Sequence, residues 1–375
     1  MTGSKQYTVM IKPASSLCNL RCNYCFYQDV SGHRETCSYG KMNLPFMKKM
    51  VEKLGAELRD GDGIAFGFQG GEPTLAGLSY YREFVKAVEA WGKKARVTYA
   101  LQTNGILLDE EWCRFLKEHR FLVGISYDML PELQDAVRVD SRGKGTGKQV
   151  RQAIKLLEQH RVEYNVLCTL TQQAARHPEQ IWREMERLDL KCIQFTPCLD
   201  DLAEDGANAY ALTPERFAAF YTKLFDKWEV SYRRGIYRSV KLIDDMVNLL
   251  AYGVPTGCGM DGRCQPQLIL EADGSVYPCD FYCLDEFRIG NIMDDSLEEL
   301  FQKSLASETK KRKPLPERCE SCPYVRACGG NCPRMQKTIC FSKEGDDCGY
   351  RVLWEACGER LARLASEQRR LHGRN

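Results

Sequence analysis

The first 200 residues of the chain alternate between short β-type runs and amphipathic helical stretches. Runs rich in β-branched and aromatic residues predict six strands, and apolar residues at helical spacing predict helices between them. The predicted strands are 7–11, 64–69, 97–103, 122–127, 164–170 and 192–197. The predicted helices are 43–58, 79–92, 109–119, 147–160 and 177–187. This alternation predicts an α/β fold in which parallel βα units close into a partial (β/α)6 barrel.

Polar motifs follow three of these strands. The sequence QGGE at 69–72 follows the second strand, QTNG at 102–105 ends the third, and SYD at 126–128 ends the fourth. In barrels of parallel strands the chemistry lies at the carboxyl ends of the strands. We therefore expect these three motifs to border one functional site.

The last third of the chain has a different character. Residues 213–252 read as helical, and after Gly257 the sequence is rich in Gly, Pro and Cys, with strand-like pieces only at 267–271 and 275–277. So little regular structure predicts a small module held together by metal centres. A charged final helix near 350–370 is expected on the outside. The predicted domains are a barrel at 1–235, a cysteine-rich domain at 236–348 and a C-terminal helix at 349–375.

The cysteine count indicates what kind of metal is bound. The 375 residues include 19 cysteines, an odd number, and no export signal precedes them, so clustered thiolates are favoured over disulfides. Only five histidines are present, and none forms a metal-binding pair at ligand spacing. Ligation by sulfur alone favours iron–sulfur clusters or structural zinc.

Charge and hydropathy exclude other classes of partner. Lysine plus arginine number 53 against 51 for aspartate plus glutamate, a net charge of +2, which gives no general attraction to nucleic acid or anionic lipid. No apolar run has the length of a membrane span, and residues 1–9 are polar. We expect a cytoplasmic protein without a nucleic-acid or membrane partner.

A compact cysteine motif directly follows the first predicted strand. Cys18, Cys22 and Cys25 have the spacing C-x3-C-x2-C. Three thiolates on one loop can hold three irons of a [4Fe–4S] cube and leave the fourth iron open, which makes sense if a small molecule chelates there. The alternatives are half of a zinc site, or loop cysteines with no common role.

This loop resembles the signature of the radical S-adenosylmethionine (SAM) enzymes, which have an aromatic residue before the third cysteine and a partial (β/α)6 barrel. The resemblance implies that SAM chelates the open iron and that its reductive cleavage yields a 5′-deoxyadenosyl radical. It also implies further SAM contacts, which are listed here by role. Gly70, Gly71 and Glu72 match the motif that receives the methionine ammonium. Ser126 and Arg138 match the pair that handles the methionyl carboxylate and ribose. Tyr24 and Leu199 match the positions that contact the adenine.

Seven later cysteines resemble the seven-cysteine SPASM domain of radical SAM enzymes that modify peptides, and Cys258, which precedes them, makes eight. By this resemblance two auxiliary [4Fe–4S] clusters are present. Cluster I would be held by Cys258, Cys264, Cys279 and Cys332, and cluster II by Cys319, Cys322, Cys328 and Cys348. Spacing alone also permits a pair of zinc sites. The remaining cysteines are expected in the core or in loops: Cys37, Cys113, Cys168, Cys192, Cys198, Cys283, Cys340 and Cys357.

Four further segments, at 12–16, 68–77, 101–105 and 277–282, resemble the anaerobic sulfatase-maturating enzymes. The resemblance implies oxidation of a cysteine or serine in a Cys/Ser-x-Pro/Ala-x-Arg segment to Cα-formylglycine, after hydrogen abstraction from Cβ. It implies an unfolded or nascent sulfatase polypeptide as substrate and an electron donor such as flavodoxin or ferredoxin. Asp280 matches the family's proton acceptor; read alone, it is also compatible with a turn after Cys279.

One segment departs from that family, and other functions stay open. Where the family often has Asp-Gly-Pro, this chain has Asp128-Met129-Leu130-Pro131, with Gln134 near a position that is often His. The main alternative is a SPASM enzyme that forms thioether or carbon–carbon crosslinks in a ribosomal peptide. Two further alternatives are a metal-bound scaffold for protein interaction and an RNA-modifying radical enzyme. The balanced charge of the chain disfavours the RNA-modifying enzyme.

Overall fold

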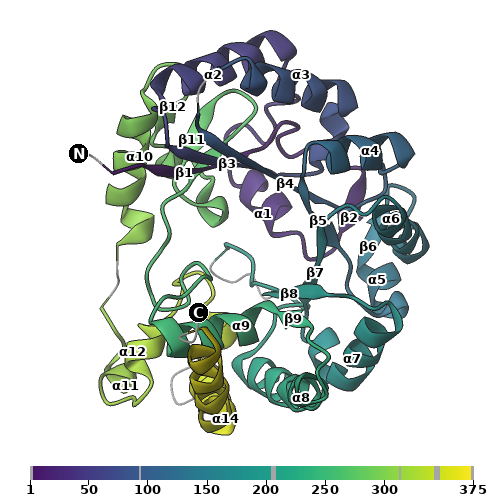
Figure 1. The fold of residues 1–375 in the computed structure, drawn as a ribbon, viewed down its shortest axis with the longest axis vertical. Helices are drawn as coiled ribbons and strands as arrows, with labels where there is room; N and C mark the ends of the chain where they lie inside the picture. The colour runs from purple at the N-terminus through teal and green to yellow at the C-terminus, as the bar shows by residue number, and fades with distance from the viewer. Residues whose placement is uncertain (1–2, 93, 204–207, 312–313, 342–346, 373–375) are drawn as a thin grey trace. The chain divides into compact units, whose positions relative to one another are not determined.

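The computed structural model describes residues 3–92, 94–203, 208–311, 314–341 and 347–372. The chain forms two compact units (Figure 1). The first unit comprises Met1–Ser126, Val137–Tyr164 and Pro266–Lys311, and the second comprises Tyr127–Ala136, Asn165–Gln265 and Arg312–Asn375. The domain boundaries expected at 235 and 348 stay a prediction.

A largely parallel sheet forms the first unit, with strand order β12-β11-β10-β1-β3-β4-β5. Its strands are β1 (Gln6–Ile11), β3 (Gly63–Phe68), β4 (Arg96–Thr103), β5 (Leu122–Ser126), β10 (Leu268–Leu270), β11 (Ser275–Tyr277) and β12 (Gly290–Asn291). A separate antiparallel pair joins β2 (Leu20–Cys22) to β6 (Arg138–Asp140). The helices are α1 (Phe26–Gly32), α2 (Leu44–Glu57), α3 (Leu78–Glu89), α4 (Glu110–Glu118), α6 (Gly147–Gln159) and α10 (Leu297–Ala306), with 3-10 turns at Pro73–Ala76, Asp280–Tyr282, Asp285–Phe287 and Glu308–Lys310.

The register of the parallel strands brings three polar side chains to one level. Strand β1 pairs in parallel with both β3 and β10, and Ile11 is opposite Phe68 on one side and Leu270 on the other. The residues that follow these three positions are Lys12, Gln69 and Glu271. They therefore leave the sheet together, at the carboxyl edge where the functional site is expected.

Aromatic packing fixes the sheet against its helices. Phe68 lies edge-on to Tyr81 and Phe84 of α3, with ring centroids 4.9 and 5.0 Å apart. All three side chains are buried. Such pairs add about 0.5–1.5 kcal/mol each beyond the burial of area. Polar caps set the helix starts: the Asn43 side chain accepts from the Phe46 N–H at 2.9 Å, and Asp109 caps α4.

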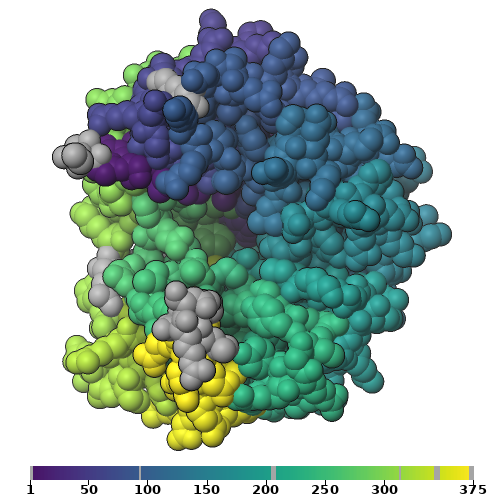
Figure 2. Space-filling model, in the orientation of Figure 1, coloured from purple at the N-terminus to yellow at the C-terminus, as the bar shows by residue number. Residues whose placement is uncertain are grey.

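Helix α10 packs on the N-terminal strand. Figure 2 shows this light green segment beside the purple strand β1. Glu298 forms an ion pair with Lys5 at 2.7 Å, and the rings of Tyr7 and Phe301 meet at 5.3 Å. A capping box of Ser296 and Glu299 starts the helix. The segment after β10 thus belongs to the same compact unit as the first strand.

The second unit contains the strand order β7-β8-β9, with β7 (Tyr164–Leu170), β8 (Cys192–Pro197) and β9 (Ser239–Val240). The bounds of β7 and β8 coincide with the prediction. Its helices are α5 (Pro131–Val137), α7 (Pro178–Arg187), α8 (Pro214–Arg233), α9 (Lys241–Tyr252), α11 (Glu317–Glu320), α12 (Val325–Cys328), α13 (Gln336–Ile339) and α14 (Gly349–His372), with a 3-10 turn at Ala174–Arg176.

Two expectations for this unit need correction. The stretch 213–252 is not helical throughout: α8 ends at Arg233, the chain turns at Gly235 with φ of +79°, and the short strand β9 precedes α9. The final helix is not simply an outer element, because α14 packs against α8 and α9 and buries Leu353, Trp354 and Leu361. Among the described residues no helix is long and apolar enough to cross a membrane.

Candidate functional site

The three-cysteine loop lies in the first unit and is held in place by β-pairing. Cys22 ends β2 and is opposite Arg138 of β6. Cys25 is the N-cap of α1, and its N–H donates to the carbonyl of Cys22 at 3.2 Å. All three thiols are partly exposed. The structure thus presents three sulfur donors on one short loop, a set suited to an iron–sulfur cluster with one open iron.

The Cys18 thiol must lose its proton to become a metal ligand, and a positive charge nearby would favour that loss. Burial raises the pKa of its thiol to about 11, so at neutral pH the free side chain keeps its proton. Metal ligation requires the thiolate, which bound iron would stabilise. The neutral Cys18 thiol and the partial exposure of all three cysteines fit a site that is completed by a cationic centre.

The two glycines of the GGE motif allow this loop to approach the sheet. A Cβ at Gly71 would overlap the carbonyl oxygen of Leu17, and one at Gly70 would lie 2.8 Å from the carbonyl oxygen of Ser15. Gly71 N–H donates to Ser15 and Glu72 N–H donates to Leu17, both at 2.8 Å. The glycines therefore fix the main chain next to Cys18 against the end of β3.

Glu72 is buried and already engaged by neighbouring donors. Its Oε1 accepts from the Thr74 N–H at 3.1 Å, the Thr74 hydroxyl at 2.6 Å and the Thr103 hydroxyl at 2.7 Å. Among the residues that the structure describes, its Oε2 accepts from the Asn104 N–H alone, at 2.8 Å. A carboxylate oxygen has two acceptor positions, so Oε2 keeps one for a further donor. Burial raises the pKa of Glu72 in spite of these hydrogen bonds.

The QTNG motif connects Glu72 to the cysteine loop, a role the sequence did not assign. The Asn104 side-chain amide donates to the Oδ1 of Asn19 at 2.8 Å and lies 3.9 Å from the sulfur of Cys18. Gln102 donates to the hydroxyl of Ser126 at 3.0 Å. The sequence signals for this motif were its position at the end of a strand and its share in the family resemblance, and neither predicted these contacts.

The other residues expected at SAM are distributed as follows. The guanidinium of Arg138 lies 5.3 Å from the centroid of the Tyr24 ring, and both side chains are largely buried. Ser126 ends β5 in the same unit. Leu199 is buried in the second unit. The first unit therefore contains Tyr24, Gly70, Gly71, Glu72, Ser126 and Arg138 together with the three cysteines.

Asp280 lies in a polar pocket at the carboxyl edge of the same sheet. Gln69 donates to its Oδ2 at 2.7 Å, and the Lys12 ammonium lies 2.7 Å from its Oδ1. Lys12 is completely buried, whereas the Asp280 side chain is 13% exposed. Among the described residues Oδ1 is buried and receives no hydrogen bond of regular geometry, although the Lys12 ammonium lies 2.7 Å away.

A second carboxylate balances the buried charges. Glu271 is fully buried, and its Oε1 lies 2.7 Å from Arg34 and 3.9 Å from Lys12. The Tyr27 hydroxyl also donates to it. Burial acts against ionisation of Glu271, but the charges of Lys12 and Arg34 outweigh it and lower its pKa. Two cations and two carboxylates therefore form a network without net charge.

Lys12 stays protonated in this pocket. Burial favours the neutral amine, but the negative charge of Asp280 is the largest opposing influence, and the pKa of Lys12 rises well above its usual value. Its ammonium also lies 3.5 Å from the centroid of the Tyr27 ring and donates to the Cys283 sulfur at 3.3 Å. Sequence reasoning singled out Asp280 and gave this lysine no role, although Lys12 directly follows a strand and begins one of the segments that resemble the family.

The second unit gathers most of the later cysteines into two groups. Cys258 and Cys264 share one loop, in which the Gln265 N–H donates to the Cys258 sulfur at 3.5 Å. A Cβ at Gly259 would lie 2.8 Å from the Cβ of Cys332, so this loop meets Cys332 directly. Cys279 follows β11 in the first unit.

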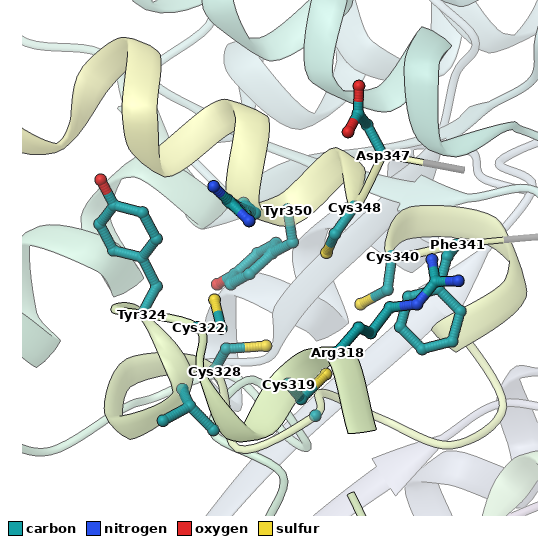
Figure 3. Close-up of a pocket in the computed structure, with 13 residues that line it drawn as sticks. Arg318, Cys319, Cys322, Tyr324, Cys328, Cys340, Phe341, Asp347, Cys348 and Tyr350 are labelled. Carbon is teal, nitrogen blue, oxygen red and sulfur yellow. The ribbon is translucent and has the colours of Figure 1, made fainter. Parts of the chain in front are cut away.

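The other group surrounds a cavity of about 260 Å³ (Figure 3). Its cysteines are Cys319, Cys322, Cys328, Cys340 and Cys348. Cys332 is absent from the lining, in keeping with a partition that assigns it to the other group. Among the described residues no three His, Cys, Asp or Glu side chains are placed to hold a single metal ion.

Comparison with known proteins identifies the family. Residues 13–173 match the radical SAM superfamily, and residues 258–323 match the SPASM iron–sulfur cluster-binding domain. The chain is 38% identical over 370 residues to a cysteine-type anaerobic sulfatase-maturating enzyme of Clostridium perfringens strain 13, covering 96% of this chain and 98% of that one. The chain belongs to the anaerobic sulfatase-maturating enzyme family.

Further relatives agree with this assignment. A cysteine-type enzyme of Clostridium novyi is 38% identical over 89% of both chains, and a serine-type enzyme of Bacteroides thetaiotaomicron is 29% identical over 92% of this chain and 85% of that one. The solved structure of native anSMEcpe with bound AdoMet superposes with a TM-score of 0.87 at 37% identity, covering 96% of this chain and 99% of that one.

This anaerobic sulfatase-maturating enzyme is thus a radical SAM oxidoreductase with a SPASM domain, and its α/β fold is confirmed. Its cofactors are SAM, a [4Fe–4S] cluster in the radical SAM domain and auxiliary iron–sulfur clusters in the SPASM domain. The thiols of the Cys18 loop fit the first of these clusters, and the thiols around the cavity fit an auxiliary one. Individual ligands stay assignments from the sequence.

Proposed function

We propose that this enzyme oxidises a cysteine in a sulfatase Cys-x-Pro/Ala-x-Arg segment to Cα-formylglycine. The observation that carries the proposal is the position of Asp280, whose Oδ2 is held by Gln69 while its Oδ1 faces Lys12. A carboxylate held in this way is suited to accept one proton from a substrate thiol. The expected substrate is an unfolded or nascent sulfatase chain.

The reaction removes two electrons from the Cβ of the substrate. When bound, SAM and the clusters supply two things: a 5′-deoxyadenosyl radical, which abstracts a Cβ hydrogen atom, and an acceptor for the remaining electron. Asp280 takes the proton from the thiol as the C–S single bond becomes the C=S double bond of a thioaldehyde. Water then adds to the thioaldehyde carbon, hydrogen sulfide leaves, and the aldehyde remains.

The residues around Asp280 hold its carboxylate in place before the reaction. Lys12 keeps a positive charge 2.7 Å from Oδ1. Gln69 donates to the other oxygen and orients the carboxylate plane. Both residues lie at strand ends, so their positions are fixed by the sheet and not by a mobile loop.

We assign the cluster ligands as the resemblance implies. Cys18, Cys22 and Cys25 hold the SAM-binding cluster, and Cys319, Cys322, Cys328 and Cys348 hold auxiliary cluster II. Cys258, Cys264 and Cys332 are three ligands of auxiliary cluster I, supported by the contact of their loops in the second unit. Cys279 is the fourth by resemblance alone. SAM binds beside the first cluster through Glu72, Ser126 and Arg138, with Tyr24 and Leu199 at the adenine.

A cysteine target is favoured over serine by the relatives. The cysteine-type enzymes are 38–40% identical to this chain, whereas the serine-type enzymes are 28–29% identical. Structures of anSMEcpe have been solved with AdoMet and the peptides named Cp18Cys and Kp18Cys. We propose a flavodoxin or ferredoxin as the electron donor that reduces the SAM-binding cluster.

The test is a reaction of the reconstituted full-length enzyme under anaerobic conditions. It receives SAM, dithionite and a peptide with either Cys-x-Pro-x-Arg or the matched Ser-x-Pro-x-Arg sequence, and mass spectrometry follows the product. We expect an aldehyde on the cysteine peptide, trapped by hydrazine, and formation of 5′-deoxyadenosine. Deoxyadenosine with both peptides unchanged would contradict the substrate assignment and favour a peptide crosslinking enzyme instead.

A further inference from the structure

Five cysteines, not four, surround the cavity of the second unit. Figure 3 shows Cys319, Cys322, Cys328, Cys340 and Cys348 around one space, and all five line the cavity. A [4Fe–4S] cube is held by four thiolates. The ligand set proposed above leaves Cys340 as an additional thiol, although the sequence placed it among the ordinary core cysteines.

The main chain holds Cys340 beside Cys348. The residue follows α13, and its N–H donates to the carbonyl of Gln336 at 2.9 Å. Its own carbonyl accepts from the N–H of Gly349, the residue after Cys348, at 2.7 Å. The Cys340 side chain is 2% exposed, whereas the four proposed ligands are all partly exposed. Cys340 is therefore fixed on the protein side of the group, away from solvent.

The Cys340 thiol contacts two of the proposed ligands. Hydrogen bonds link it to the sulfurs of both Cys328 and Cys348. A thiol has one proton to donate, and a thiolate bound to iron has lone pairs that accept it. Hydrogen bonds to ligand sulfurs draw off negative charge and stabilise the reduced form of a cluster, which raises its reduction potential.

We propose that Cys340 is a non-ligating hydrogen-bond donor whose single proton is shared between the sulfurs of Cys328 and Cys348, and that it raises the reduction potential of auxiliary cluster II. This inference rests on the proposed ligand set, but not on the identity of the peptide substrate. Cys340 is a positioning residue in this account, because it acts on the cluster only through the two ligands.

The test compares full-length wild-type enzyme with Cys340→Ala and Cys340→Val, all reconstituted with iron and sulfide. Iron and sulfide per chain are measured first, and a potentiometric titration followed by electron paramagnetic resonance comes second. Both variants should keep the wild-type iron and sulfide content while one auxiliary cluster shifts to a more negative midpoint potential. Cys340→Ser, whose hydroxyl still donates, should shift less. Valine fills the space of the thiol and keeps the test valid if the alanine variant folds poorly.

A matched control is Cys357→Ala, which removes another buried cysteine of the second unit that lies outside the cavity lining. It should leave iron content and all midpoint potentials unchanged. Loss of about four irons in Cys340→Val would make Cys340 a ligand and overturn the proposal. Full iron content with an unchanged potential would overturn it equally. Neither readout uses the peptide, so a failure of the proposed sulfatase maturation is recognised separately.

Discussion

The ammonium of Lys12 and the Oδ1 of Asp280 are 2.7 Å apart, and the lysine has no solvent-exposed surface. The negative charge of Asp280 is the largest influence that raises the pKa of Lys12, so the lysine stays protonated beside this carboxylate. Asp280 is thus held by a cation at Oδ1 and by the amide of Gln69 at Oδ2. A thiol, with an ordinary pKa near ~8.5, is a more acidic proton donor than the hydroxyl of serine, so the geometry is compatible with a cysteine target.

The first prediction concerns Asp280 itself. Asp280→Asn keeps the side-chain size but cannot take the substrate proton, so we expect aldehyde formation to fall by roughly 10²–10⁴-fold. Cleavage of SAM to 5′-deoxyadenosine should continue, because the Cys18 loop is unchanged. Both products are measured in the same anaerobic reaction by mass spectrometry.

Iron content is the control for this variant, since Asp280 directly follows the proposed ligand Cys279. Asp280→Asn with wild-type iron and wild-type aldehyde yield would exclude Asp280 as the base. If iron is lost together with activity, the variant reports on the auxiliary cluster, and Gln69→Leu then provides the second test of the Asp280 site.

Much of the scaffold could be predicted from local sequence. Strands β7 and β8 have the predicted bounds because each is a short apolar run between polar turns. The pair β2 and β6 was missed, since three-residue strands have too little pattern to recognise. The break between helices α8 and α9 was missed because residues 234–240, which include the turn at Gly235 and the two-residue strand β9, are a short segment between two helical patterns.

The polar network around Asp280 could not be predicted in the same way. Gln69 and Asp280 are 211 positions apart, and Lys12 and Cys283 are 271 apart, so only the strand register brings them together. A lysine in the sequence also suggests exposure, whereas Lys12 is buried by its place between two parallel strands. The resemblance located Asp280, and the sheet explains its neighbours.

The second prediction concerns the stability that Lys12 provides. Lys12→Met leaves two buried carboxylates with Arg34 as the remaining cation of the network, so we expect a loss of about 3–5 kcal/mol in the free energy of unfolding. Urea denaturation under anaerobic conditions measures this loss. Lys191→Met is the control: its ion pair with Asp189 is exposed, and its removal should cost under about 1 kcal/mol. Equal stability of the two variants would show that the buried pair contributes little.

The third prediction is a pH dependence. The pKa of Glu271 is lowered in the folded protein, so its contribution to stability is complete above its unfolded pKa, near ~4.3, and is lost as the pH falls through the folded value. Glu271→Gln should be less stable than wild type at pH 7. On acidification below about pH 4 the difference should narrow by up to ~1.4 kcal/mol per pH unit.

Circular dichroism during urea denaturation at several pH values between 3 and 7 checks this expectation. Acid also releases iron and sulfide, but this affects wild type and Glu271→Gln alike, so the difference between them isolates the carboxylate. A difference that stays constant over this range would mean that Glu271 has an ordinary pKa in the folded protein.

The fourth prediction tests how the GGE motif holds the cysteine loop. In Gly71→Ala the new Cβ overlaps the carbonyl of Leu17, so the main chain beside Cys18 must move away from the end of β3. We expect loss of the SAM-binding cluster, about four irons per chain, and of SAM binding, with the auxiliary clusters retained. Gly67→Ala is the matched control, because Gly67 lies in β3 and a Cβ at this position meets no atom within 4 Å. Iron analysis and equilibrium dialysis of SAM compare the two variants. Wild-type iron and SAM binding in Gly71→Ala would show that the loop tolerates the displacement and that the glycine is not needed for the site.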